Sequence, residues 1–79
     1  MVSNAALRNN VLRHFGESLR EERKRQGISQ EQLALLADVN RTYVGGVERG
    51  EENISLLTIP KLSAVLKVKP SALLAQAGL

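Results

Sequence analysis

The spacing of apolar and polar residues along the chain predicts an all-α protein. Apolar residues recur three or four positions apart through most of the sequence, which is the period of an amphipathic helix. Short polar breaks separate these stretches, so the pattern predicts five helices joined by loops of about four residues. We therefore expect a compact five-helix bundle, with residues 1–10 as a polar N-terminal lead-in and residues 11–79 as a single domain.

The first predicted helix runs to about Gln26, where Gly27 ends it, and it begins between Ser3 and Asn10. Gly16 lies inside this helix, at a cost of ~1 kcal/mol relative to alanine. Two interpretations of Gly16 stay open. It either allows close packing against a second helix or is simply tolerated.

Residues 29–49 predict two short helices joined by a tight turn. Ser29 and Gln32 have the spacing of a capping box, which opens the first of these helices. We predict that its buried face carries Leu33, Ala34, Leu36 and Ala37. Asp38 then interrupts the period in the turn, at a position that favours a residue tolerant of positive φ.

The second helix of this pair is predicted from about residue 41 to residue 49, with Asn40 as its N-cap and Gly50 as its end. Its inward face carries Val44, Val47 and Glu48. With that face turned inward, the outward face holds Thr42, Gly45, Gly46 and Arg49. Two helices of about eight residues bury too little apolar surface to be stable alone, so the rest of the chain must support them.

This pair of helices resembles the helix-turn-helix of the Xre/Cro–CI phage-repressor family. The resemblance is carried by the small Ala34, by Asp38 four residues later, and by the two valines that seat the second helix on the first. It covers about residues 15–74, although the family usually has glycine at Asp38. The run RTYVGGVERG is most similar to the restriction–modification controller proteins of that family. The resemblance implies a lambda-repressor-like DNA-binding domain.

In the resembling family the second helix of the motif enters the major groove of duplex DNA. The resemblance therefore implies that Arg41 and Thr42, at the start of this helix, contact base edges. Arginine suits this role because its guanidinium can bond both acceptors of a guanine. By position, the residues that resemble phosphate contacts are Gln30, Asn40, Tyr43 and Arg49.

Two features of the second helix leave alternatives open. Gly45 and Gly46 together cost ~2 kcal/mol in a helix. Either a bare helix face seats deeper in the groove, which makes Gly46 part of the DNA-binding surface, or the helix is loose and orders only on binding. Glu51 and Glu52 would repel a nearby phosphate backbone. Either their loop points away from DNA, or they pair with basic residues.

Arg23 falls on the inward side of the first helix, four residues after Leu19, and Glu48 shares the inward face of the second motif helix. In resembling repressors an arginine and a glutamate at these positions pair across the two helices. We predict the same partly buried ion pair here.

The C-terminal part of the chain predicts two more helices. Pro60 should lie in the first turn of a helix capped near Ser55 or Thr58, and Pro70 should open the last helix. Residues 54–79 hold more large apolar side chains than one face of two short helices can bury, which indicates an interface. We expect a two-fold homodimer, with Leu56, Ile59 and Val65 at its interface.

The composition limits which partners, metal sites and activities the chain could have. The net charge of +3 and the isoelectric point near 9.8 permit an anionic partner. The chain has no cysteine and one histidine, so we expect no disulfide, no metal site and no cofactor. The sequence shows no acid–base pair and no nucleophile with a base beside it. We therefore expect that the protein is not an enzyme. No ligand pocket for a small-molecule effector is inferable.

No apolar run is long enough to span a membrane, and no signal-peptide pattern opens the chain, so we expect a cytoplasmic protein. The function that fits best is a sequence-specific transcriptional regulator that binds double-stranded DNA as a homodimer on a palindromic operator. If the controller resemblance holds, it regulates its own operon. The alternatives are an antitoxin-type repressor and a helical adaptor that binds protein and no DNA.

Overall fold

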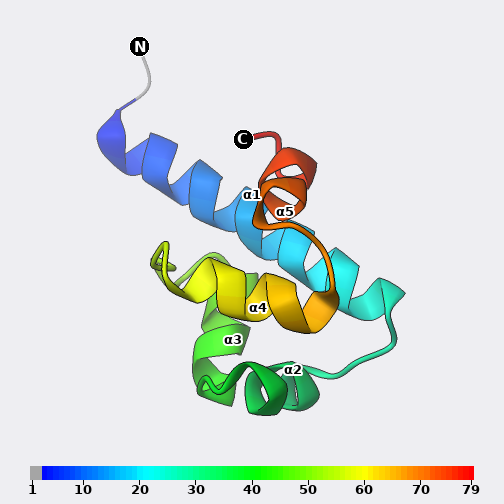
Figure 1. Ribbon diagram of the computed structural model, residues 1–79. Coiled ribbons are helices and arrows are strands. Elements are labelled where there is room, and N and C mark those ends of the chain that lie inside the picture. The colour runs from blue at the N-terminus through cyan, green and yellow to red at the C-terminus, as the bar shows by residue number, and fades with distance from the viewer. Residues whose placement is uncertain (1–2) are drawn as a thin grey trace.

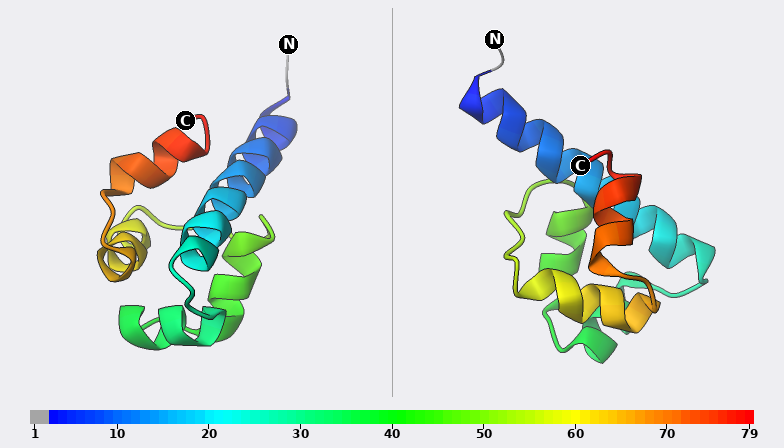
Figure 2. Two further views of the ribbon diagram at one scale, coloured as in Figure 1. Left: turned by 90° about the vertical axis from the view of Figure 1, so that its right-hand side faces the viewer. Right: turned by 45° about the horizontal axis from the view of Figure 1, so that its top comes forward.

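The computed structural model describes residues 3–79, and every regular element in this part of the chain is a helix (Figure 1). The helices are α1 (Asn4–Arg25), α2 (Gln30–Ala37), α3 (Arg41–Glu48), α4 (Thr58–Leu66) and α5 (Pro70–Gln76). The predicted all-α five-helix bundle is confirmed. α1 lies between α3 on one side and α5 on the other, while α2 crosses below and contacts α3 and α4 (Figure 2).

The core lies where these helices meet. It is formed by fully buried leucines, valines and one phenylalanine from all five helices, principally Phe15, Leu19, Leu33, Val44, Val47, Leu62, Leu66 and Leu73. Because each helix contributes only one or two of these side chains, no helix pair could hold the fold by itself.

α1 begins within the range that the sequence predicts. The Ser3 hydroxyl caps it by accepting a hydrogen bond from the Ala6 backbone N–H at 3.1 Å. The helix then continues without a break past the boundary that we predict between residues 10 and 11. Residues 4–10 are nevertheless all exposed, and residues 1–2 of the predicted lead-in lie outside the described part of the chain.

The caps of the two motif helices follow the sequence signals. Ser29 and Gln32 form the reciprocal capping box of α2, and Asp38 ends that helix in the left-handed conformation with φ 57°. Asn40 Oδ1 accepts from the Thr42 backbone N–H at 2.7 Å and so caps α3. The prediction that Leu36 is buried is wrong, because its side chain is 67% exposed. At about 100° per residue, Leu36 lies well outside the stripe of the three residues that are buried.

Gly16 marks the closest approach of α1 to α3, which decides between its two interpretations. A Cβ placed on Gly16 would meet the backbone carbonyl oxygens of Val47 and Glu48, the latter at 2.7 Å. These are backbone atoms that cannot rotate aside. Only glycine lets α1 pack this closely on α3.

We expect Gly16→Ala to lower the free energy of unfolding by ~1–3 kcal/mol, because the added methyl group pushes α1 off α3. The expected change is a net loss, because the packing penalty should outweigh the ~1 kcal/mol by which alanine favours a helix over glycine. Urea denaturation measures the change, with Glu17→Ala on the exposed side of α1 as the control. A Gly16→Ala protein as stable as the wild type would contradict the close packing.

α4 and α5 complete the scaffold. Pro60 is the third residue of α4 and Pro70 is the first of α5, so each lies in a first turn, as predicted. The buried Ser18 hydroxyl donates to the Leu73 carbonyl at 2.7 Å and joins α1 to α5. Glu22 accepts hydrogen bonds from the Gln26 and Gln76 side chains, and these bonds hold the pKa of Glu22 below its ordinary value.

Among residues 3–79, none of the helices combines the length and the apolar character that crossing a membrane requires. The same residues contain no cluster of three potential metal-ligating side chains.

Candidate nucleic-acid interface

α3 is held by its apolar face and presents its first turn to solvent. Val44 and Val47 are buried against α1 and α2, while Arg41 and Thr42 are exposed. Tyr43 is half-buried and packs against the core. The start of α3 therefore exposes a guanidinium, a hydroxyl and the partial positive charge of a helix N-terminus, all suited to base edges or phosphates.

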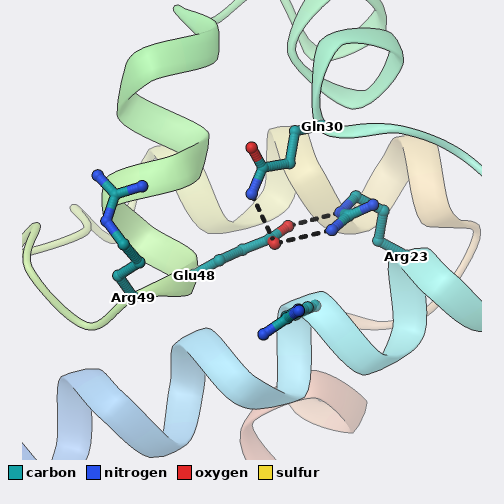
Figure 3. Close-up of a pocket in the computed structure, with 5 residues that line it drawn as sticks. Arg23, Gln30, Glu48 and Arg49 are labelled. Atoms are coloured by element: carbon teal, nitrogen blue, oxygen red, sulfur yellow. Dashed lines mark hydrogen bonds and ion pairs between the residues drawn. The ribbon is translucent and has the colours of Figure 1, made fainter.

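The predicted pair of Arg23 and Glu48 is present and locks α3 to α1. Arg23 Nε donates to Glu48 Oε2 at 2.7 Å, and Nη2 donates to Oε1 at 2.9 Å, in a two-pronged contact (Figure 3). The third guanidinium nitrogen donates to the Ile28 carbonyl at 2.9 Å. Both residues are more than nine-tenths buried. The hydrogen bonds to the Glu48 carboxylate raise the pKa of Arg23.

Gln30 also belongs to this cluster. Its side-chain Nε2 donates to Glu48 Oε1 at 3.0 Å, so α2 joins α1 and α3 at one carboxylate (Figure 3). One of the two N–H donors of the Gln30 side-chain amide is therefore used inside the protein. Gln30 can still offer an anion its second amide N–H and its backbone N–H, which has no helical partner in the first turn of α2.

The prediction that Gly45 and Gly46 lie on the outward face is wrong, because both are buried. The loop after α3 folds back, and the backbone N–H groups of Glu51 and Glu52 donate to the Gly46 carbonyl. A Cβ on Gly46 would lie 2.6 Å from Glu52 Cγ, and a Cβ on Gly45 would lie 3.1 Å from Arg49 Nη1. The glycines thus accommodate the side chains that cover them.

For Glu51, one of the two glutamates in the loop after α3, the structure shows pairing with a basic residue. Its Oε2 accepts from Arg49 Nε at 3.0 Å, so this glutamate pairs with a basic residue at the end of α3. Both side chains of that pair are more than half exposed. Arg49 and Asn40 are exposed, as phosphate contacts must be, although the Asn40 oxygen is occupied by the α3 cap.

The three residues predicted for a dimer interface have different environments. Leu56 is 79% exposed and Val65 is half-buried, whereas Ile59 is 8% exposed and belongs to the core. Placing Ile59 at an interface was therefore wrong. Ile59, Leu62 and Leu66 lie on the inward face of α4. They are three and four positions apart, and this helical spacing is already visible in the sequence. Leu57, which the sequence analysis does not place at the interface, is 82% exposed.

The chain matches a known family over most of its length. A family described as helix-turn-helix matches residues 19–73. Control protein C.BamHI of Bacillus amyloliquefaciens is 43% identical over 67 residues, which cover 84% of this chain and 83% of that protein.

Solved structures agree with this match. The restriction-modification controller protein C.AhdI from Aeromonas hydrophila has a TM-score of 0.77 and 52% identity, over 78% of this chain and 94% of that one. The regulator of biofilm formation SinR, solved in complex with DNA, has a TM-score of 0.73 and 36% identity, over 76% of this chain and 97% of that one.

Proposed function

This chain belongs to the helix-turn-helix family of DNA-binding transcriptional regulators, and on that premise we propose that it is a restriction–modification controller that binds a palindromic operator as a homodimer. Membership of a regulator family also agrees with the prediction that the chain is not an enzyme. As a controller it would regulate its own operon and linked genes.

The observation that carries the proposal is the exposed first turn of α3. Arg41 and Thr42 stand free of the bundle at the N-terminus of a helix that Val44, Val47 and Glu48 fix in place. A rigid helix with a free arginine at its start is what reading a guanine in the major groove requires. Asn40, Tyr43 and Arg49 flank this turn as phosphate contacts. The surplus of basic residues over acidic ones, 11 against 8, supports an anionic partner.

The dimer is supported by apolar surface that the bundle leaves uncovered. Leu56 and Leu57 are exposed side by side before α4, with Val65 half-buried on that helix. In a two-fold dimer the two α3 helices would meet successive major grooves, so half-sites should repeat at about 10 base pairs.

Salt dependence tests DNA binding. A duplex selected from a random pool should bind more tightly than a scrambled duplex, and both should weaken steeply as salt rises. Each neutralised phosphate contributes a log–log slope of about −0.9. A protein that binds no duplex at any salt concentration would instead be an adaptor that binds protein. An antitoxin-type repressor would bind DNA and also retain a toxin encoded beside it.

The double variant Leu56→Lys/Leu57→Lys should be monomeric at concentrations where the wild type is a dimer, because two charges desolvated at an apolar interface oppose association. Light scattering measures the mass, and Leu35→Lys, at an equally exposed leucine of α2, is the control. A wild-type monomer at high micromolar concentration, or a dimeric double variant, would contradict this interface.

A further inference from the structure

A cavity of about 260 Å³ opens beside the buried ion pair, at the junction of α1, α2 and α3. It is lined by Arg20, Arg23, Gln30, Glu48 and Arg49, so three of its five side chains are arginines (Figure 3). No polar side-chain atom buried in the described residues lacks a hydrogen-bond partner, so the cavity does not serve to solvate an orphaned internal group.

The charges around this cavity do not cancel. Each nitrogen of the Arg23 guanidinium donates one hydrogen bond, to Glu48 or to the Ile28 carbonyl, and the pair of Arg23 with Glu48 is neutral as a unit. The Arg20 side chain makes no hydrogen bond or ion pair within residues 3–79, although it lines the cavity and is exposed. Arg49 gives only its Nε to Glu51, in an exposed pair. Two guanidinium groups therefore have donors to spare at one opening.

We propose that this cavity binds one phosphate group of the DNA backbone, and that Arg20 of α1 is a phosphate-binding residue alongside Arg49. The inference deepens the proposed function and depends on it. It adds to the DNA contacts a residue that lies outside the helix-turn-helix itself.

Geometry favours a phosphate over other anions. The planar fork of arginine matches phosphate oxygens, and two such forks can bind two oxygens of one group. The cavity also adjoins the first turn of α2, where backbone N–H groups lack helical partners and favour a negative charge. Arg49 and Gln30, which lie over Gly45 on α3, connect the cavity to the helix proposed to enter the groove.

At Arg49 the phosphate would either bind the remaining guanidinium nitrogens beside Glu51 or replace Glu51, because an exposed pair of this kind is held weakly. Arg20 needs no exchange, because no carboxylate competes for it among the described residues. We therefore expect Arg20 to bind the phosphate without first giving up an ion pair inside the protein.

The test compares Arg20→Gln with Lys24→Gln. Both variants remove one positive charge from an exposed site of α1, but only Arg20 lines the cavity. For each half-site, Arg20→Gln should weaken binding to the preferred and the scrambled duplex by the same factor, about tenfold. It should also make the log–log salt slope shallower by about 0.9 per half-site, because one phosphate contact is lost. Lys24→Gln should change either quantity much less.

An Arg20→Gln protein indistinguishable from Lys24→Gln would overturn the phosphate site while leaving DNA binding intact. A wild type that binds no duplex would overturn the proposed function and the phosphate site together. A second measurement needs no variant. In the wild-type protein, the Nε–H resonances of Arg20 and Arg49 should both shift when the scrambled duplex is added. An Arg20 resonance that stays unchanged at saturation would also overturn the inference.

Discussion

Replacing Glu48 with alanine is expected to lower the free energy of unfolding by ~3–5 kcal/mol. The substitution leaves the Arg23 guanidinium more than nine-tenths buried without the carboxylate that neutralises it. It also releases the Gln30 amide, so one change frees contacts on α1 and α2 together. A domain of this size has a total stability of about 5–15 kcal/mol, and the variant should be close to unfolding at body temperature.

Urea denaturation of the single and double variants measures this effect. Arg23→Met combined with Glu48→Leu should be less destabilised than either Arg23→Met or Glu48→Leu alone, because the double variant buries no unpaired charge. Glu51→Ala removes the exposed partner of Arg49 and should change stability by no more than ~1 kcal/mol. A Glu48→Ala protein as stable as the Glu51→Ala control would show that the buried pair does not hold α3.

Replacing Arg41 with alanine should remove the preference for one base in each half-site. We expect a loss of ~1–3 kcal/mol per half-site against the preferred duplex, and about twice that for the dimer. The scrambled duplex should lose less, because a wrong base offers the guanidinium no matched pair of acceptors. Arg41 is exposed at the first position of α3, so its removal should not affect folding.

Arg49→Ala and Tyr43→Phe are the matched controls, because both change predicted phosphate contacts on the same helix or at its end. They should weaken binding to every sequence by a similar factor, because phosphate contacts position a protein without choosing bases. Arg49→Ala should also make the log–log salt slope shallower, because it removes a positive charge that contacts a phosphate. Titrations of a preferred and a scrambled duplex at two salt concentrations separate the two kinds of contact. Equal losses on both duplexes for Arg41→Ala would make Arg41 a backbone contact.

The sequence by itself determined the elements and how they end. Capping by Ser29 and Asn40, the left-handed turn at Asp38 and the prolines in the first turns of α4 and α5 are all present where the pattern predicts them. These signals act over three or four residues through backbone hydrogen bonds, so a linear sequence contains them in full.

The buried ion pair was also predictable, but for a different reason. Arg23 and Glu48 are 25 residues apart, and periodicity shows only that both fall on inward faces. The family resemblance supplied the pairing, and the structure supplied its third member, Gln30.

Only the tertiary structure decided which outward positions stay open. Helical period places Gly46 outward, yet the Glu52 side chain covers it. Arg20 lines a cavity because α1, α2 and α3 meet beside it. Exposure depends on which distant segment lies opposite a residue. That relation is set by helix crossing and by how loops fold back, and neither leaves a local pattern in the sequence.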